Sequence, residues 1–215
     1  MKHIFRPFLL FICWEATFSP VFAEDFPLIM QGKTNTIYLN KNEKPVVQTA
    51  MDMFLSDMQE VSDKKPVTES SLDNAAIIVT TIGKSNETDE WLKKQSISTA
   101  DIKDKWEAFK IEVFQKNNRS YLAVLGSDER GTAYGILELS RIIGVSPWRW
   151  WADSAPAKKK SLNLPESYVN VQQPSVQFRG IFLNDEDWGL MPWSSKNFEA
   201  TLVKGEIGPK TYAKI

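Results

Sequence analysis

The sequence predicts an α/β protein in which a mixed sheet is covered by helices. Two observations support this prediction. Between residues 36 and 143, apolar patterns follow one another in the order strand, helix, strand, hairpin, helix, which is typical of an α/β sandwich. Residues 75–83 contain no charged side chain, and such a continuous run indicates a central strand covered on both faces. We therefore place an N-terminal α/β domain at residues 24–155.

The first strand is expected at residues 36–40, and a helix follows it. Pro45 suits the start of that helix, because the backbone N–H that proline lacks is unpaired there in any case. Apolar residues then recur at three- and four-residue intervals, which lays one stripe against the sheet. The stripe consists of Val47, Ala50, Met51, Phe54, Leu55 and Met58. Residues 88–106 are more polar, and we expect an exposed insertion there with a short helix at 88–95.

A hairpin and a second long helix complete the domain. Residues 109–115 alternate between apolar and polar side chains, which predicts a half-exposed strand, and 121–125 are wholly apolar, which predicts a buried partner. Ser127 or Asp128 is expected to cap a helix that ends at Gly144. The glycines at 126, 131 and 135 lack GxGxxG spacing, so we interpret them as allowing close helix packing and do not predict a nucleotide or any other cofactor.

The composition limits the partners, metal sites and catalytic groups that the chain can have. The chain has 215 residues and a formal net charge of -1, which argues against a nucleic-acid partner. Its only cysteine and only histidine, Cys13 and His3, both lie in the first 23 residues. A mature chain without that segment has no disulfide, no Cys/His zinc site and no Ser-His or Cys-His pair. We therefore predict no metal site, and catalysis is left to carboxylate, Lys, Tyr and Ser/Thr side chains.

Residues 1–23 have the order of features expected of a signal peptide. Lys2 and Arg6 precede an apolar stretch, and Val21-Phe22-Ala23 offers small residues at the positions that a signal peptidase reads. The apolar stretch is too short to span a bilayer. We predict an exported protein, periplasmic or extracellular, whose mature chain begins at Glu24.

Tryptophans are concentrated beyond the second helix. Five of the eight lie between residues 148 and 193, and a basic linker is expected at 156–174. Trp148 and Trp150 have two interpretations of similar weight. They form either an apolar plug between two domains or a platform on which sugar rings stack.

Residues 176–183 form an apolar run that predicts a buried strand, and the polar residues Asn184, Asp185, Glu186 and Asp187 follow it directly. In parallel α/β sheets and barrels, ligands collect at the carboxyl ends of strands. We therefore expect Asn184, Asp185 and Glu186 to bind substrate. For Asp187 the competing interpretation is a structural carboxylate that pairs with Arg179. The Asp-Glu-Asp run lacks the spaced ligands of a calcium loop.

Four passages together resemble glycoside hydrolase family 115, the xylan α-1,2-glucuronidases. They are Gly126-Ser-Asp-Glu-Arg-Gly-Thr-Ala-Tyr-Gly-Ile136, residues 144–153 (GVSPWRWWAD), residues 176–190 (VQFRGIFLNDEDWGL) and residues 205–215 (GEIGPKTYAKI). The resemblance implies an amino-terminal α/β domain followed, at residues 175–215, by the first strand and the start of the first helix of a (β/α)8 catalytic barrel. It implies removal of (4-O-methyl)glucuronic acid side chains from glucuronoxylan, and it leaves oligomerisation of the full-length enzyme open.

Family members continue for several hundred more residues, so we expect this chain to be a truncated, inactive N-terminal fragment. Glycosidases use two carboxyl groups roughly 5–9.5 Å apart. Neighbours on a strand point to opposite faces, so Asp185 and Glu186 do not suit that pair. The main catalytic acids are therefore expected beyond residue 215. The alternative function is a non-catalytic secreted carbohydrate-binding module that uses the tryptophan cluster, or a decayed gene product.

Overall fold

The computed structural model describes residues 25–149, 154–186, 188–199 and 206–214. The chain divides into two compact units, Met1–Gln173 and Pro174–Ile215. The signal peptide expected at 1–23, Trp150 and Asp187 lie outside the described residues. The elements of the first unit are β1 (Phe26–Ile29), β2 (Thr36–Leu39), α1 (Pro45–Ser62), β3 (Val67–Glu69), β4 (Ile77–Thr81), α2 (Asn86–Lys94), β5 (Phe109–Lys116), β6 (Arg119–Gly126), α3 (Glu129–Ile143), β7 (Leu162–Leu164) and β8 (Val169–Gln172). The second unit contains α4 (Leu190–Trp193), the π-helix η1 (Ser194–Phe198) and α5 (Pro209–Lys214).

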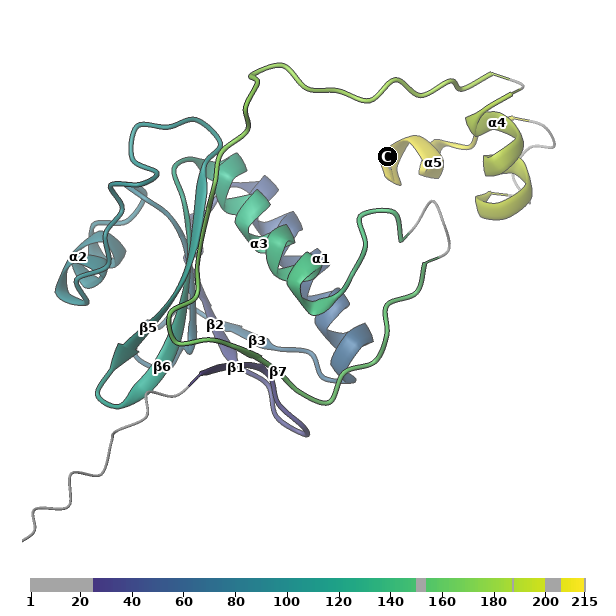
Figure 1. Ribbon diagram of the computed structural model, residues 1–215. Coiled ribbons are helices and arrows are strands. Elements are labelled where there is room, and N and C mark those ends of the chain that lie inside the picture. The colour runs from purple at the N-terminus through teal and green to yellow at the C-terminus, as the bar shows by residue number, and fades with distance from the viewer. Residues whose placement is uncertain (1–24, 150–153, 187, 200–205, 215) are drawn as a thin grey trace, which may run out of the picture. The chain divides into compact units, whose positions relative to one another are not determined.

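The first unit is built on a six-stranded mixed sheet with the strand order β3-β2-β4-β6-β5-β8. Strand β2 runs parallel to β3 and β4, and β4 runs parallel to β6, whereas β5 is antiparallel to both β6 and β8. Helices α1 and α3 cover one face of the sheet and α2 lies on the other (Figure 1). The predicted mixed sheet with helices is confirmed.

The strongest local patterns form the elements that they predict. Helix α1 begins at Pro45, and the predicted stripe is buried, with Val47 and Phe54 fully inaccessible to solvent. Helix α3 is capped by Asp128, whose carboxylate accepts a hydrogen bond from the Gly131 N–H at 2.7 Å. Its C-cap is Gly144, with φ of 100°, a left-handed conformation that favours glycine.

The insertion between β4 and β5 is exposed at most of its polar positions, as predicted, but it also contributes to the core. Its apolar residues Leu92, Ile97 and Ile102 are buried and form a second core against the face of the sheet opposite α1 and α3. The sequence signal is weak because these three side chains are widely spaced among polar ones. Strand β5, predicted to be half exposed, is therefore mostly buried, and Lys110 pairs with Asp101 at 3.5 Å.

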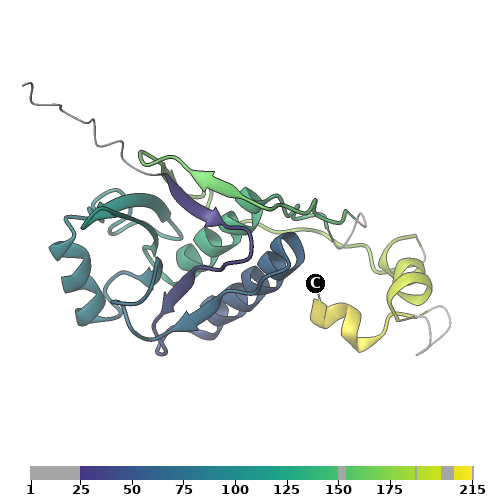
Figure 2. The same ribbon diagram turned by 90° about the horizontal axis from the view of Figure 1, so that it is seen from below.

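The segment predicted to be a linker, 156–174, also differs from expectation. It contains β7, which pairs antiparallel with β1, and β8, which adds to the main sheet beside β5. Figure 2 shows this green segment running beside the purple β1. These strands have three and four residues of mixed polarity, so no local period marks them, and their pairing depends on partners far away in the sequence. The first unit consequently extends to Gln173.

The apolar run 176–183 forms no strand in the described structure. Phe178, Ile181 and Phe182 are 89%, 82% and 90% exposed. Within the described ranges no other strand pairs with this run, so its side chains have nothing to pack against. The first strand of a barrel therefore stays a prediction.

Candidate functional site

Asn184, Asp185 and Glu186 lie in one loop of the second unit, directly before α4. The loop is held by Asn184, whose backbone carbonyl accepts a hydrogen bond from the Leu190 N–H at 2.8 Å. Its side-chain Oδ1 accepts another from the Glu186 N–H at 3.0 Å, as in an Asx turn. Asn184 therefore shapes the loop with both of its oxygens.

Gly189 closes the same loop. A Cβ atom at this position would lie 2.0 Å from the Asn184 carbonyl oxygen, so no larger residue fits without moving the backbone. The Gly189 N–H also donates to the Glu186 carbonyl oxygen at 3.1 Å. The loop thus presents consecutive carboxylates from a short, internally hydrogen-bonded turn.

The two carboxylates of the loop have different surroundings. The Tyr212 hydroxyl, from α5, donates a hydrogen bond of 2.8 Å to Asp185 Oδ2. This hydrogen bond raises the pKa of Tyr212 above its ordinary value of 10.0. Asp185 and Glu186 are both exposed, and in the described part of the chain the Glu186 carboxylate has no hydrogen bond or ion pair.

Helix α5 is fixed within the second unit by Glu199. This carboxylate accepts hydrogen bonds from the Lys210 N–H at 3.1 Å, and from the Thr211 N–H and hydroxyl at 2.6 Å each. Burial acts to raise the pKa of Glu199, but the hydrogen bonds from Thr211 and Lys210 outweigh it and the pKa is lowered. A further bond of 2.6 Å joins the Thr211 and Ser194 hydroxyls, and both of these side chains are fully buried.

Trp148 lies in the first unit, in the loop after α3, and 63% of it is exposed. The adjacent Arg149 anchors this loop to α1 through Asp57, at 3.4 Å, and Glu60. Burial raises the pKa of Asp57. The Trp148 side chain is thus presented to solvent by an anchored loop, and both of its interpretations, an apolar plug between two domains and a sugar-stacking platform, stay predictions.

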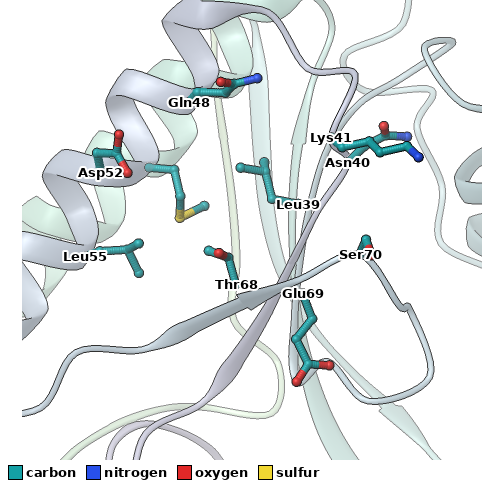
Figure 3. A pocket seen from close by; sticks show the side chains of 10 residues that line it. Leu39, Asn40, Lys41, Gln48, Asp52, Leu55, Thr68, Glu69 and Ser70 are labelled. Carbon is teal, nitrogen blue, oxygen red and sulfur yellow. The ribbon is translucent and has the colours of Figure 1, made fainter.

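A hollow of about 410 Å³ lies at the carboxyl ends of β2 and β3, beside the first turns of α1 (Figure 3). Its lining is mixed, with apolar Leu39, Met51 and Leu55 beside polar Asn40, Lys41, Gln48, Asp52, Thr68, Glu69 and Ser70. None of the predicted site residues lines it.

The carboxyl end of β4 is filled by protein groups. Glu43, only 4% exposed, accepts hydrogen bonds of 2.8 Å from the Thr81 N–H and the Thr81 hydroxyl, and this hydroxyl also contacts the Thr132 hydroxyl at 2.7 Å. Across the described ranges there is no cluster of His, Cys, Asp and Glu side chains suited to a metal ion. Among the helices in those ranges, none has the length and apolar character needed to cross a membrane.

Comparisons with known proteins show which family the chain resembles. Residues 171–215 match the model of glycosyl hydrolase family 115. A solved structure of a family GH115 4-O-methyl-α-glucuronidase, BtGH115A, with specificity for decorated arabinogalactans, shares 44% sequence identity over 87% of the chain, with a TM-score of 0.75. The chain resembles the amino-terminal part of glycoside hydrolase family 115. It spans 24% of the length of BtGH115A.

Two other solved structures are less similar. CpGH84D shares 15% identity and covers 65% of this chain and 21% of its own, with a TM-score of 0.43. A GH138 enzyme targeting pectin rhamnogalacturonan II shares 14% identity and covers 60% of this chain and 15% of its own, with a TM-score of 0.29. Neither supports an argument about fold at these scores. None of the curated proteins matches the chain.

The family match contains the loop residues and Tyr212 together. Asn184, Asp185 and Glu186 were predicted from their place after an apolar run, but Tyr212 was not. The sequence offered one indication of Tyr212, because residue 212 falls in one of the four passages that resemble the family. Only the hydrogen bond to Asp185 distinguishes it from its neighbours.

Proposed function

We propose that this chain is the amino-terminal part of an exported glycoside hydrolase that removes (4-O-methyl)glucuronic acid side chains from a polysaccharide. The observation that supports this most is the 44% identity to a 4-O-methyl-α-glucuronidase over 87% of the chain. The match of residues 171–215 to the family 115 model adds support at the loop itself.

In this proposal the loop 184–186 binds substrate. Asp185 keeps one carboxylate oxygen free of the Tyr212 bond, and the exposed Glu186 carboxylate offers two more acceptors for sugar hydroxyls. Trp148 and Trp150 are candidates for stacking against sugar rings, and 63% of Trp148 is exposed. A glycosidase needs an acid and a second carboxylate across the anomeric carbon, and one loop supplies one side only. The main catalytic acids then come from residues outside this chain, and the chain alone is inactive.

Two polymers are candidate substrates. Glucuronoxylan follows from the activity of the xylan α-1,2-glucuronidases that the sequence resembles. Decorated arabinogalactan is favoured by the specificity of BtGH115A.

The test uses two proteins: the 215-residue chain, and a chimera in which this chain replaces the corresponding segment of BtGH115A. Release of glucuronic acid is measured from both polymers. We expect none from the chain and release from the chimera. In the chimera, Asp185→Ala or Glu186→Ala lowers turnover on the order of a hundredfold or more, whereas Asp73→Ala, at an exposed carboxylate of the first unit, does not. Unchanged turnover in both loop variants, or release by the chain alone, contradicts the proposal.

Export is proposed from residues 1–23. Intact-mass measurement of material recovered outside the cytoplasm is expected to give a chain beginning at Glu24. A cytoplasmic product that keeps Met1 contradicts this part of the proposal and leaves the enzymatic part standing.

A further inference from the structure

Tyr212 and Asp185 come from different elements of the second unit, 27 residues apart in the sequence. The Tyr212 hydroxyl donates to Asp185 Oδ2 at 2.8 Å, within the range of a charge-assisted O–H···O hydrogen bond. Both side chains are exposed, so burial does not force them together. The geometry of α5 brings them into contact.

That geometry is built by buried groups. Glu199 accepts hydrogen bonds from the Lys210 and Thr211 N–H groups in the first turn of α5, and the Thr211 hydroxyl is joined to that of Ser194 in η1. Gly208 permits this approach, because a Cβ there would lie 2.4 Å from the Glu199 carboxyl carbon. Tyr212 follows Thr211 directly, so its backbone is fixed by an inaccessible hydrogen-bond network while its ring extends to the surface.

We propose that Tyr212 is a positioning residue, which fixes the Asp185 carboxylate so that its second oxygen is presented to a substrate hydroxyl. This inference rests on the proposed function of the loop. An exposed aspartate samples several rotamers, and a substrate must pay the entropy of selecting one. A phenol held by helix α5 selects the Asp185 rotamer before the sugar binds, which is how supporting residues preorganise a site.

The Tyr212 phenol is suited to this role. A phenol is protonated throughout the neutral range and can donate to a carboxylate there, and the Asp185 hydrogen bond raises its pKa further. With Oδ2 occupied, Asp185 offers Oδ1 as an acceptor, and Asn184 keeps its own side chain in the turn. The loop therefore presents a carboxylate of defined direction next to the exposed Glu186.

The first experiment uses the 215-residue chain and detects phenolate formation by ultraviolet absorbance. Subtracting the titration curve of Tyr212→Phe from that of the wild type leaves the titration of the Tyr212 phenol. This phenol is expected to have a pKa above the ordinary value of 10.0. Asp185→Ala is expected to return that phenol to the ordinary value, and Tyr134→Phe, a control in the first unit, is expected to leave it unchanged. An ordinary titration that is insensitive to Asp185→Ala overturns the inference, whatever the activity of any longer protein.

The second experiment uses the active chimera. Tyr212→Phe is expected to lower kcat/KM on the order of tenfold, the effect of losing one hydrogen bond to a charged group. In the Asp185→Ala background the same substitution is expected to have no further effect, because a positioning residue acts through the group that it positions. An equal loss in both backgrounds shows a general structural role and overturns the inference. If Asp185→Ala itself has no effect, the proposed role of the loop fails; if only Tyr212→Phe has none, the inference alone fails.

Discussion

Replacing Gly131 with alanine places a methyl group against the backbone of Ala108, directly before β5. The added Cβ would lie 2.2 Å from the Ala108 carbonyl oxygen, roughly 1 Å closer than an ordinary C···O contact. That carbonyl cannot rotate away freely, because it accepts a hydrogen bond of 2.9 Å from the Ser127 N–H, while the Ala108 N–H donates to Ser127 Oγ at 2.9 Å. A shift of about 1 Å breaks these bonds, since a donor-acceptor distance near 3.9 Å is no longer a hydrogen bond.

Three contributions determine how far Gly131→Ala changes the free energy of unfolding. Two lost hydrogen bonds cost about 2 kcal/mol and residual overpacking at least about 1 kcal/mol. Alanine in place of glycine in a helix returns up to about 1 kcal/mol. We therefore expect Gly131→Ala to lower the free energy of unfolding by about 2 kcal/mol.

Gly135→Ala on the same helix is the matched control. Its Cβ would meet a side-chain methyl, Val124 Cγ1, at 2.9 Å, and a side chain adjusts more easily than a carbonyl held by hydrogen bonds. The propensity gain is similar, so it largely cancels in the comparison, and Gly135→Ala is expected to be close to neutral. Urea unfolding followed by circular dichroism measures both. A Gly131→Ala protein at least as stable as Gly135→Ala refutes the close-packing interpretation of these glycines.

Three further outcomes are expected. Burial raises the pKa of Asp57, so the stability that its protonated form contributes falls as pH rises from 3.8 through the folded-state pKa. Over this pH range, the free energy of unfolding of Asp57→Asn, measured in urea, should rise relative to that of the wild type. A difference between the two proteins that does not change with pH contradicts this prediction. In hydrogen exchange, the Ile78 amide of central strand β4 should be protected and that of Ile181 should not, so equal protection contradicts the exposed placement of 176–183. The pKa of Glu199 is lowered in the folded state, so the stability that its carboxylate contributes is present above pH 4.5 and is lost as pH falls through the folded-state pKa. In that pH range, hydrogen-exchange protection of the Thr211 amide should decline in the wild type but not in Glu199→Gln.

The sequence by itself determined the elements that a local pattern specifies. The stripe of α1, the start at Pro45, the Asp128 cap of α3 and the β5–β6 hairpin are each encoded within a few residues, because helix period, cap chemistry and turn residues act over one or two turns. The loop 184–186 was also identified locally, as polar residues that follow an apolar run. Its resemblance to family 115 came from the same short passages.

Only the tertiary structure decided the contacts that join distant residues. The pairing of β7 with β1, the addition of β8 to the main sheet and the second core beneath the insertion join segments that have no shared period. The Tyr212 bond to Asp185 and the Glu199 cap of α5 belong to the same class. A hydrogen bond or an apolar contact between distant residues depends on which surfaces the folded chain brings within about 3–4 Å, and local propensity carries no information about that choice.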